Sequence, residues 1–264
     1  EKNKITYLWD AFKFMNQKLE IDFENYFKIN SSNTIDSQNV VKIYDQQIYI
    51  GENVLIHPGV VLDASNGPII ISSNVKVGTN SVLEGPLFIG GNSEISPLSL
   101  IRGNTSIGPF CKIGGEVSCS IFHGYSNKVH HGFIGNSYIG EWVNIGAGTN
   151  NSNLKNNYGD VKILFEDKII NTEIQFMGVL IGDYSRIAIG TNLNTGTCIS
   201  IGANIFNYDL KNRYIKPFSW GMDKKVNFNR FIETIEIMKE RRNKNIFKAE
   251  KKYLKFLYEE LKSN

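Results

Sequence analysis

The sequence is poor in cysteine and has no long apolar run. Its three cysteines, Cys111, Cys119 and Cys198, form no Cys-x-x-Cys pair and lack the spacing of metal ligands. An odd and sparse set of thiols favours a reducing cytoplasm over a disulfide-bonded secreted domain. No run of about 18 apolar residues predicts a membrane span, and nothing resembles a signal peptide. We therefore expect a cytoplasmic protein that has no membrane partner.

Proline is also scarce, and the net charge is small. The 264 residues include 6 Pro against 24 Gly, and the formal net charge is +3. Residues 221–264 hold 12 Lys and Arg against 7 Asp and Glu, whereas the rest of the chain is slightly acidic. A basic tail suits an anionic ligand such as a phosphate or coenzyme A, although a solvated helix face has the same pattern. Because acids alternate with the bases, no nucleic-acid partner is expected.

Aliphatic residues recur at intervals of six. The longest unbroken series consists of Ile71, Val77, Leu83, Ile89, Ile95, Ile101, Ile107 and Ile113. The same interval recurs in Ile50, Ile56 and Leu62, in Ile139 and Ile145, and in Ile181, Ile187, Leu193 and Ile199. A period of six is neither helical nor that of a simple strand, but it fits short strands joined by turns into triangular coils stacked about 4.8 Å apart. The sequence predicts an all-β solenoid, a left-handed parallel β-helix of hexapeptide repeats.

The repeat has flanking segments and interruptions. We expect an N-terminal connector in residues 1–42, with helical apolar spacing over 8–27, and the β-helix in residues 43–206. Breaks at 116–127 and at the Asn-rich excursion 150–174 are expected to form loops on the binding face.

Residues 207–264 should form a C-terminal tail with α-helices. Asn227 is placed to cap the first helix. The expected apolar stripes are Phe231, Ile235 and Met238 on one helix, and Phe247, Leu254, Leu257 and Leu261 on the other. These stripes predict packing against the solenoid or against a neighbouring subunit.

Two of the four histidines, His130 and His131, shortly precede Asn144 and the turn Gly146-Ala147-Gly148. A neutral imidazole can accept a proton from an amine, and a turn of small residues can offer backbone N–H groups to an oxyanion. Adjacent residues in a strand face opposite sides, so one of the two histidines is expected to point into a given groove. Asn144 and Asn153 either contact a ligand or stack as hydrogen-bonded ladders at coil corners, and the residues alone leave both open.

These motifs resemble a known family. The segment Ile-Gly-Glu-Trp-Val-Asn-Ile-Gly-Ala-Gly-Thr, with a His thirteen to fourteen residues before its Asn, resembles the acetyltransferase half of bifunctional bacterial UDP-N-acetylglucosamine pyrophosphorylase/glucosamine-1-phosphate acetyltransferases. Gly-Gly-Glu-Val, Gly-Tyr-Ser-Asn-Lys, Asn-Leu-Lys-Asn-Asn-Tyr and Pro-Phe-Ser-Trp-Gly resemble a family of sugar nucleotidyltransferases that carry this β-helix. The resemblance extends from about Trp9 to the terminal helices.

The resemblance implies an N-acetyltransferase that uses acetyl-CoA as co-substrate and acts on an amino sugar phosphate or a nucleotide sugar. It implies a homotrimer with active sites between neighbouring solenoids. His130 would be the catalytic base, and the Ala147 N–H would contact acetyl-CoA and stabilise the oxyanion. The implied substrate contacts are Arg102, Lys128, Asn144 and Asn153, and the implied coenzyme A contact is Thr191. No metal and no covalent intermediate is implied.

The resemblance also implies a missing neighbour in the chain. Residues 1–42 resemble the end of a nucleotidyltransferase-like domain followed by a connector. The sequence begins with Glu1 rather than Met, and we therefore expect it to be a piece of a longer protein.

Two departures from the family pattern make the acceptor sugar uncertain. Phe133 stands where the family has a substrate-contacting tyrosine, and Ser118-Cys119 replaces an expected pair of phosphate-binding lysines. Lys112 or Lys128 could compensate for that pair. The departures keep open an alternative, in which the β-helix is a scaffold or sugar-nucleotide-binding module of a nucleotidyltransferase.

Two other chemistries fit the sequence less well. A zinc carbonic anhydrase on this fold needs histidines at i and i+5, and His123, His130 and His131 do not have that spacing. Cys119 as a covalent nucleophile has no identifiable partner in the sequence. His131 remains the rival of His130 for the role of base.

Overall fold

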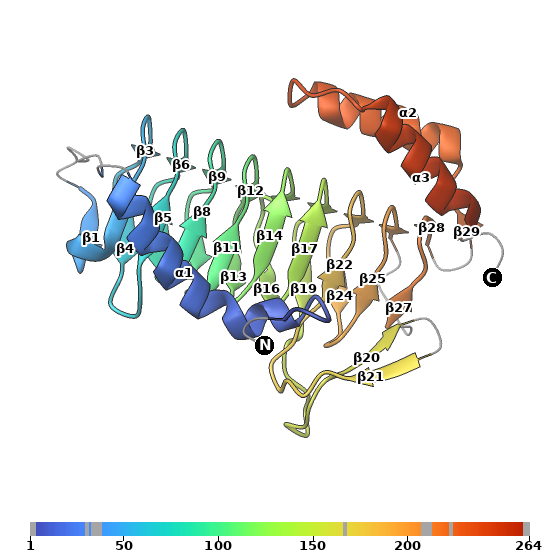
Figure 1. Ribbon diagram of the computed structural model, residues 1–264, viewed down its shortest axis with the longest axis horizontal. Helices are drawn as coiled ribbons and strands as arrows, with labels where there is room; N and C mark the ends of the chain where they lie inside the picture. Colours follow the sequence, from blue (N-terminus) through green and yellow to red (C-terminus); the bar gives the residue numbers. More distant parts are fainter. Residues whose placement is uncertain are drawn as a thin grey trace.

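The structure is a computed structural model that describes residues 4–29, 32, 39–165, 168–206, 213–221 and 224–260. Three parallel sheets, named A, B and C, wind around one axis as a left-handed β-helix, which confirms the predicted fold (Figure 1). Equivalent residues of successive coils pair in register, as Leu62, Leu83 and Ile101 do in sheet A. Each sheet therefore stacks strands from successive coils.

The strands are short, and up to β18 each sheet takes every third one. Sheet A contains β1 (Val41–Ile43), β4 (Val61–Asp63), β7 (Val82–Glu84), β10 (Leu100–Ile101), β13 (Glu116–Ser118) and β16 (Phe133–Gly135). Sheet B contains β2 (Ile48–Ile50), β5 (Ile69–Ile71), β8 (Leu87–Ile89), β11 (Thr105–Ile107), β14 (Ile121–Gly124), β17 (Tyr138–Glu141), β22 (Leu180–Ile181), β25 (Cys198–Ile199) and β27 (Tyr214–Ile215). Sheet C contains β3 (Leu55–Ile56), β6 (Lys76–Val77), β9 (Glu94–Ile95), β12 (Lys112–Ile113), β15 (Asn127–Lys128), β18 (Asn144–Ile145), β23 (Arg186–Ile187), β26 (Asn204–Ile205), β28 (Ser219–Trp220) and the antiparallel β29 (Lys224–Lys225).

Smaller elements complete the solenoid. A pair of strands, β19 (Asn150–Asn151) and β24 (Asn192–Leu193), continues the side of sheet A. A short 3₁₀ helix, η1, spans Asp45–Gln47.

The six-residue period marks the core. All eight residues of the series from Ile71 to Ile113 point inward and are at most 1% exposed. Burying one such aliphatic side chain contributes about 1.5–3 kcal/mol. The repeated inward side chain is therefore the main stabiliser of the coil.

The expected N-terminal helix forms and lies on sheet B. Helix α1 (Asp10–Ile29) crosses the strands of this sheet (Figure 1). The Tyr26 ring lies 5.3 Å from the Tyr49 ring and 6.3 Å from the Phe88 ring. At the other end of the helix, Trp9 is buried in a cluster with Val161. The outer face of sheet B is thus covered along α1.

The two expected breaks behave differently. An excursion leaves the solenoid where one was expected, but it begins after β19 and not at residue 150, and it carries the projecting hairpin of β20 (Lys162–Phe165) and β21 (Lys168–Asn171) (Figure 1). The loop predicted at 116–127 is wrong, because β13 and β14 continue the coil there. The period is broken by a corner of only two residues, Gly114-Gly115, and by a spacing of five between the inward Val117 and Phe122. Gly115 adopts a φ of 73° in that corner. Glycine tolerates this left-handed conformation without a steric penalty.

The C-terminal helices α2 (Phe228–Glu240) and α3 (Lys248–Glu260) also form. Asn227 caps α2 as predicted, since its side chain accepts a hydrogen bond from the Arg230 N–H at 3.1 Å. Phe231 and Ile235 are buried against the solenoid. Phe247 was wrongly placed in the second stripe: it precedes α3 and is 73% exposed. Leu261 lies outside the described residues. Among the described helices, none combines the length and apolar character of a membrane span.

The helices pack on a column of aromatic residues where sheet B turns into sheet C, here called the B–C corner. All of its members have φ between 53° and 61°, and they are Phe110, Tyr125, Trp142, Tyr184 and Phe218. Tyr125 stacks on Phe110 at 4.9 Å and on Trp142 at 4.4 Å between ring centroids.

Candidate functional site

The predicted base lies where sheet C turns into sheet A, here called the C–A corner. This corner recurs in successive coils as residues 57–60, 78–81, 96–99, 114–115, 129–132, 146–149 and 188–191. Residues 129–132, called the histidine turn, contain His130 and His131. These residues form a turn and not a strand, so strand alternation does not choose between the two imidazoles, and both are exposed.

His131 and Ala147 stack in successive coils at this corner. The Gly148 N–H donates to the His131 carbonyl at 3.0 Å, and the Gly190 N–H donates to the Ala147 carbonyl at 2.7 Å. The His131 Nε2 lies 3.5 Å from the point where a Cβ on Gly148 would stand. An imidazole therefore lies directly beside the small-residue turn.

The backbone of that turn offers a hydrogen-bond donor. Gly146 and Gly148 donate to the carbonyls of Ile187 and His131. Within the described part of the chain, the Ala147 N–H donates no hydrogen bond. This N–H group has no acceptor and lies next to an imidazole. Such an arrangement can stabilise a developing oxyanion while the imidazole transfers a proton.

A second group of predicted residues meets on the outer face of sheet A. A Cβ on Gly135 would stand 2.4 Å from Cζ of Phe133 and 3.0 Å from Nδ2 of Asn153. The Phe133 ring and the Asn153 amide therefore share the space above this glycine. Asn153 also donates to Asn136 Oδ1 at 2.7 Å, so the two amides pair between successive coils.

Arg102 and Asn144 lie apart from this group. Arg102 is exposed after β10, on the side of sheet A, where its Nε donates to Glu116 Oε1 at 3.0 Å. Asn144 is exposed on the outer face of sheet C, in register with Asn127 and Arg186. Within one chain, Asn144 and Asn153 are thus on different sheets, on either side of the C–A corner.

Lys128 and Thr191 point into the coil. Lys128 is 1% exposed, and its Nζ donates to the carbonyls of Gly114 at 2.7 Å and of His130 at 2.9 Å. Burial disfavours its charged form and lowers its pKa to about 8. Thr191 is fully buried and donates to the Ala188 carbonyl at 2.8 Å. Neither side chain lines an outer face in this structure, so neither reaches a ligand bound there.

Sequence reasoning missed two asparagines that hold β16. Asn150 Oδ1 accepts the Phe133 N–H at 2.9 Å. Asn151 Oδ1 accepts the Gly135 N–H at 2.8 Å, and its Nδ2 donates to the Gly135 carbonyl at 3.0 Å. The signal was available, because Asn151 stands six residues after Ile145, at an inward position of the repeat.

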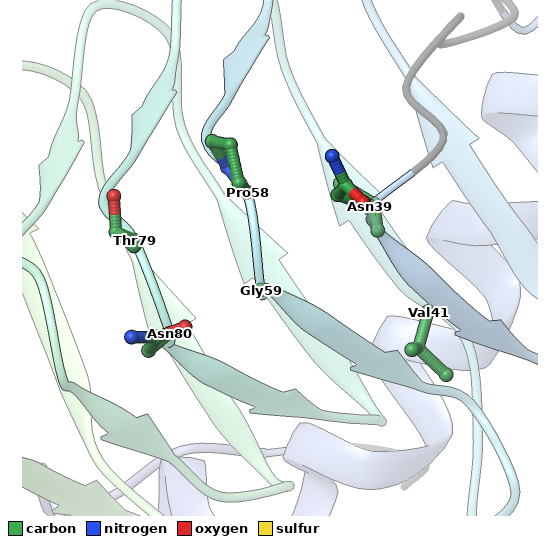
Figure 2. Close-up of a pocket in the computed structure, with 7 residues that line it drawn as sticks. Asn39, Val41, Pro58, Gly59, Thr79 and Asn80 are labelled. Atoms are coloured by element: carbon green, nitrogen blue, oxygen red, sulfur yellow. The ribbon is translucent and has the colours of Figure 1, made fainter.

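Away from the histidine turn, the described chain has a further pocket. An open pocket near the N-terminal end of the C–A corner is lined by Asn39, Val40, Val41, Pro58, Gly59, Thr79 and Asn80 (Figure 2). It has no titratable side chain, so it offers no group for acid–base chemistry. No three His, Cys, Asp or Glu side chains of the described residues lie close enough to hold a metal ion.

Part of the chain is similar to a known protein. The chain is 34% identical over 98 residues to the bifunctional sugar-1-phosphate nucleotidylyltransferase/acetyltransferase of Sulfurisphaera tokodaii. The similar region covers 37% of this chain and 24% of that relative, so the chain matches about a quarter of its length. No protein-family profile matches the chain.

Proposed function

We propose that the chain is an acetyl-CoA-dependent N-acetyltransferase that acts on an amino sugar phosphate resembling glucosamine-1-phosphate. The observation that carries the proposal is the C–A corner. There the exposed imidazoles of His130 and His131 lie one coil below the Ala147 N–H, which has no hydrogen-bond acceptor in the described chain. The β-helix supports it, and so does the relative whose name includes acetyltransferase.

In the proposed reaction, His130 removes a proton from the sugar amine, and the amine nitrogen attacks the thioester carbonyl. The Ala147 N–H donates to the oxyanion that forms. Collapse of this intermediate breaks the carbon–sulfur bond, and the coenzyme A thiolate takes the proton from the imidazolium. The transfer needs no covalent enzyme intermediate.

The acceptor is proposed to lie on the outer face of sheet A. Phe133 and Asn153 would contact the sugar, and Arg102 would pair with its phosphate. Because Asn144 lies on another sheet, it can join such a site only from a second subunit. A homotrimer with sites between solenoids is therefore part of the proposal, and light scattering that gives a mass other than three chains would contradict it.

The test is thiol release from acetyl-CoA in the presence of glucosamine-1-phosphate and related amino sugars. We expect His130→Ala to lower kcat by about 10²–10⁴-fold, the range that general bases contribute. His131→Ala is the matched control, because it removes an equally exposed neighbouring imidazole. Loss of turnover in His131→Ala alone would move the role of base to that residue. No turnover with any amino sugar would favour the scaffold alternative.

A further inference from the structure

Two inward columns, one in sheet C and one on the side of sheet A, are apolar apart from Lys42 in the first coil and two residues that flank the histidine turn. In sheet C the inward column consists of Ile56, Val77, Ile95, Ile113, Lys128, Ile145, Ile187 and Ile205. On the side of sheet A it consists of Lys42, Leu62, Leu83, Ile101, Val117, Ile134, Asn151 and Leu193. Lys42 lies in the first coil, where its side chain is 22% exposed and its Nζ lies 3.2 Å from Asp45 Oδ1. Lys128 and Asn151 are 1% and 4% exposed. The coil interior is thus polar at Lys128, which directly precedes the histidine turn, and at Asn151, which lies one coil above β16.

Lys128 compensates for a mismatch between successive corners. The corner 114–115 has two residues and the histidine turn above it has four, so their backbones cannot pair residue by residue. In the described chain, the carbonyls of Gly114 and His130 accept a hydrogen bond from Lys128 Nζ and from no other group. Ser96, one coil further down, donates to the Val129 carbonyl at 3.0 Å across the short corner. Side chains therefore hold the lower side of the histidine turn.

Asn151 holds the next part of the same segment. Strand β19 pairs with β24 but not with β16, and the Asn151 amide bonds both the N–H and the carbonyl of Gly135 instead. Gly135 is the residue over which Phe133 and Asn153 meet. The position of these two side chains thus depends on an amide inside the coil.

Stability alone would favour aliphatic residues at both positions. A buried ammonium group loses its hydration, and well-packed apolar residues are often as stable or more stable in its place. The aliphatic residues in the other coils show that the fold does not require polarity there. Local departures from a fold's own rules are expected at functional sites.

We infer that Lys128 and Asn151 are positioning residues, which hold the histidine turn and Phe133 in place from inside the coil. The inference rests on the proposed function, since it assigns these residues to the acetyl transfer at His130. They touch neither substrate nor acetyl-CoA. Their effect passes through the His130 carbonyl and through Gly135.

The test uses Lys128→Met and Asn151→Leu, which place apolar side chains at the two positions. Ile113→Met is the matched control, because Ile113 is the register partner of Lys128 in the coil below. We expect both variants to fold and to lose at least tenfold in kcat, with an unchanged KM for acetyl-CoA. Lys128→Gln, whose amide can donate two hydrogen bonds, should recover part of the loss. The control should keep the wild-type kcat.

Amide hydrogen exchange gives a readout that does not depend on turnover. The Gly148 and Glu116 N–H groups donate to the carbonyls of His131 and Gly132 in the histidine turn. In Lys128→Met, both should exchange at least tenfold faster, while the amides of distant coils keep their rates. If the wild type acetylates no amino sugar, the proposed function fails, and the exchange result still decides the positioning role.

Two outcomes would overturn the inference. The first is a folded Lys128→Met with wild-type kcat or with unchanged exchange at Gly148 and Glu116. The second is a Lys128→Met that fails to fold while Ile113→Met folds, because the lysine would then serve folding alone.

Discussion

The Nζ of Lys239 lies 2.8 Å from Oε1 of Glu250, and this ion pair joins helix α2 to helix α3. Lys239 is only 7% exposed, and its Nζ also lies 5.1 Å from the centre of the Trp142 ring. The Tyr184 hydroxyl donates to Glu250. Burial, followed by this hydrogen bond, raises the pKa of Tyr184. The ion pair therefore fastens both C-terminal helices to the aromatic column of the B–C corner.

Replacing Glu250 with alanine should detach this helical pair. The change leaves a buried ammonium without its partner, which costs about 3 kcal/mol or more. We expect the helices to lose protection against proteolysis while the coils keep theirs, because contacts in a solenoid are local. Glu259→Ala is the control, since Glu259 pairs with Lys255 on the exposed surface at 3.9 Å and should change stability by less than about 0.5 kcal/mol. Equal effects of the two substitutions would contradict the prediction.

Leu98→Asn should stabilise the protein. Leu98 has a φ of 59° and is 76% exposed, and Asn80 occupies the equivalent corner position one coil earlier with a φ of 57°. A left-handed backbone costs an ordinary L-residue about 1–2 kcal/mol and is better tolerated by Asn. We expect a gain of about 0.5–1 kcal/mol in the free energy of unfolding, measured by denaturant titration. A loss would show that the exposed leucine makes a stabilising contact, as in a subunit interface.

Ile101→Asp should unfold the solenoid. Ile101 is fully buried at an inward position of sheet A, where a carboxylate would have no partner and would cost at least several kcal/mol. Leu98→Asp puts the same charge three residues earlier, in solvent, and should leave the protein folded. Circular dichroism and thermal unfolding of the two variants make the comparison. A soluble Ile101→Asp with an unchanged Tm would contradict the inward register of the repeat.

The spacing of aliphatic residues predicted the architecture because each inward side chain is buried in its own coil. Ile71 and Ile113 follow from periodicity alone, since a residue every six positions must point inward in a triangular coil. The helix capped by Asn227 follows from an equally local signal. The sequence signals for these elements are therefore local, although the strands themselves pair between coils, as Leu83 does with Ile101.

The candidate site depends on contacts that spacing does not encode. The corner at Gly114-Gly115 has two residues where the other C–A corners have four, and the coil continues through it. The loss of the six-residue period there therefore marks a shorter corner and not a loop. The inward direction of Lys128 follows from that shortening by two residues together with a second one, by one residue, between the inward Val117 and Phe122. The separation of Asn144 and Asn153 onto different sheets is likewise a property of the wound coil, and a motif comparison places them together only because they are close in sequence.

Arg102→Met should weaken binding of a phosphorylated acceptor. Its guanidinium pairs with Glu116 on the exposed surface, where such a pair contributes less than about 1 kcal/mol to stability. We expect KM for the phosphorylated amino sugar to rise at least tenfold, with no change for the unphosphorylated sugar and no change in Tm. Glu116→Gln is the control, because it releases the guanidinium and should leave KM the same or lower. An equal rise in KM for both sugars would remove phosphate recognition from Arg102.

Lys128 should also make stability depend on pH. Its pKa falls from 10.5 to about 8 because burial disfavours the ammonium form. Between these two values the unfolded chain binds more protons at this site than the folded chain does. Stability therefore rises as the pH increases from about 8 to about 10.5, and this contribution is constant below that window.

Lys128→Met removes this titration and isolates its effect. The free energy of unfolding of the wild type relative to the variant should increase by about 2–3 kcal/mol between pH 7.5 and about pH 10.5. Other groups titrate in the same range, including Cys111, whose pKa burial raises to about 12, but they are common to both proteins and cancel in the difference. Denaturant titrations at intervals of half a pH unit would measure it. Parallel curves for the two proteins would mean that the Lys128 ammonium keeps its hydration, and therefore that it does not lie inside the coil beneath His130.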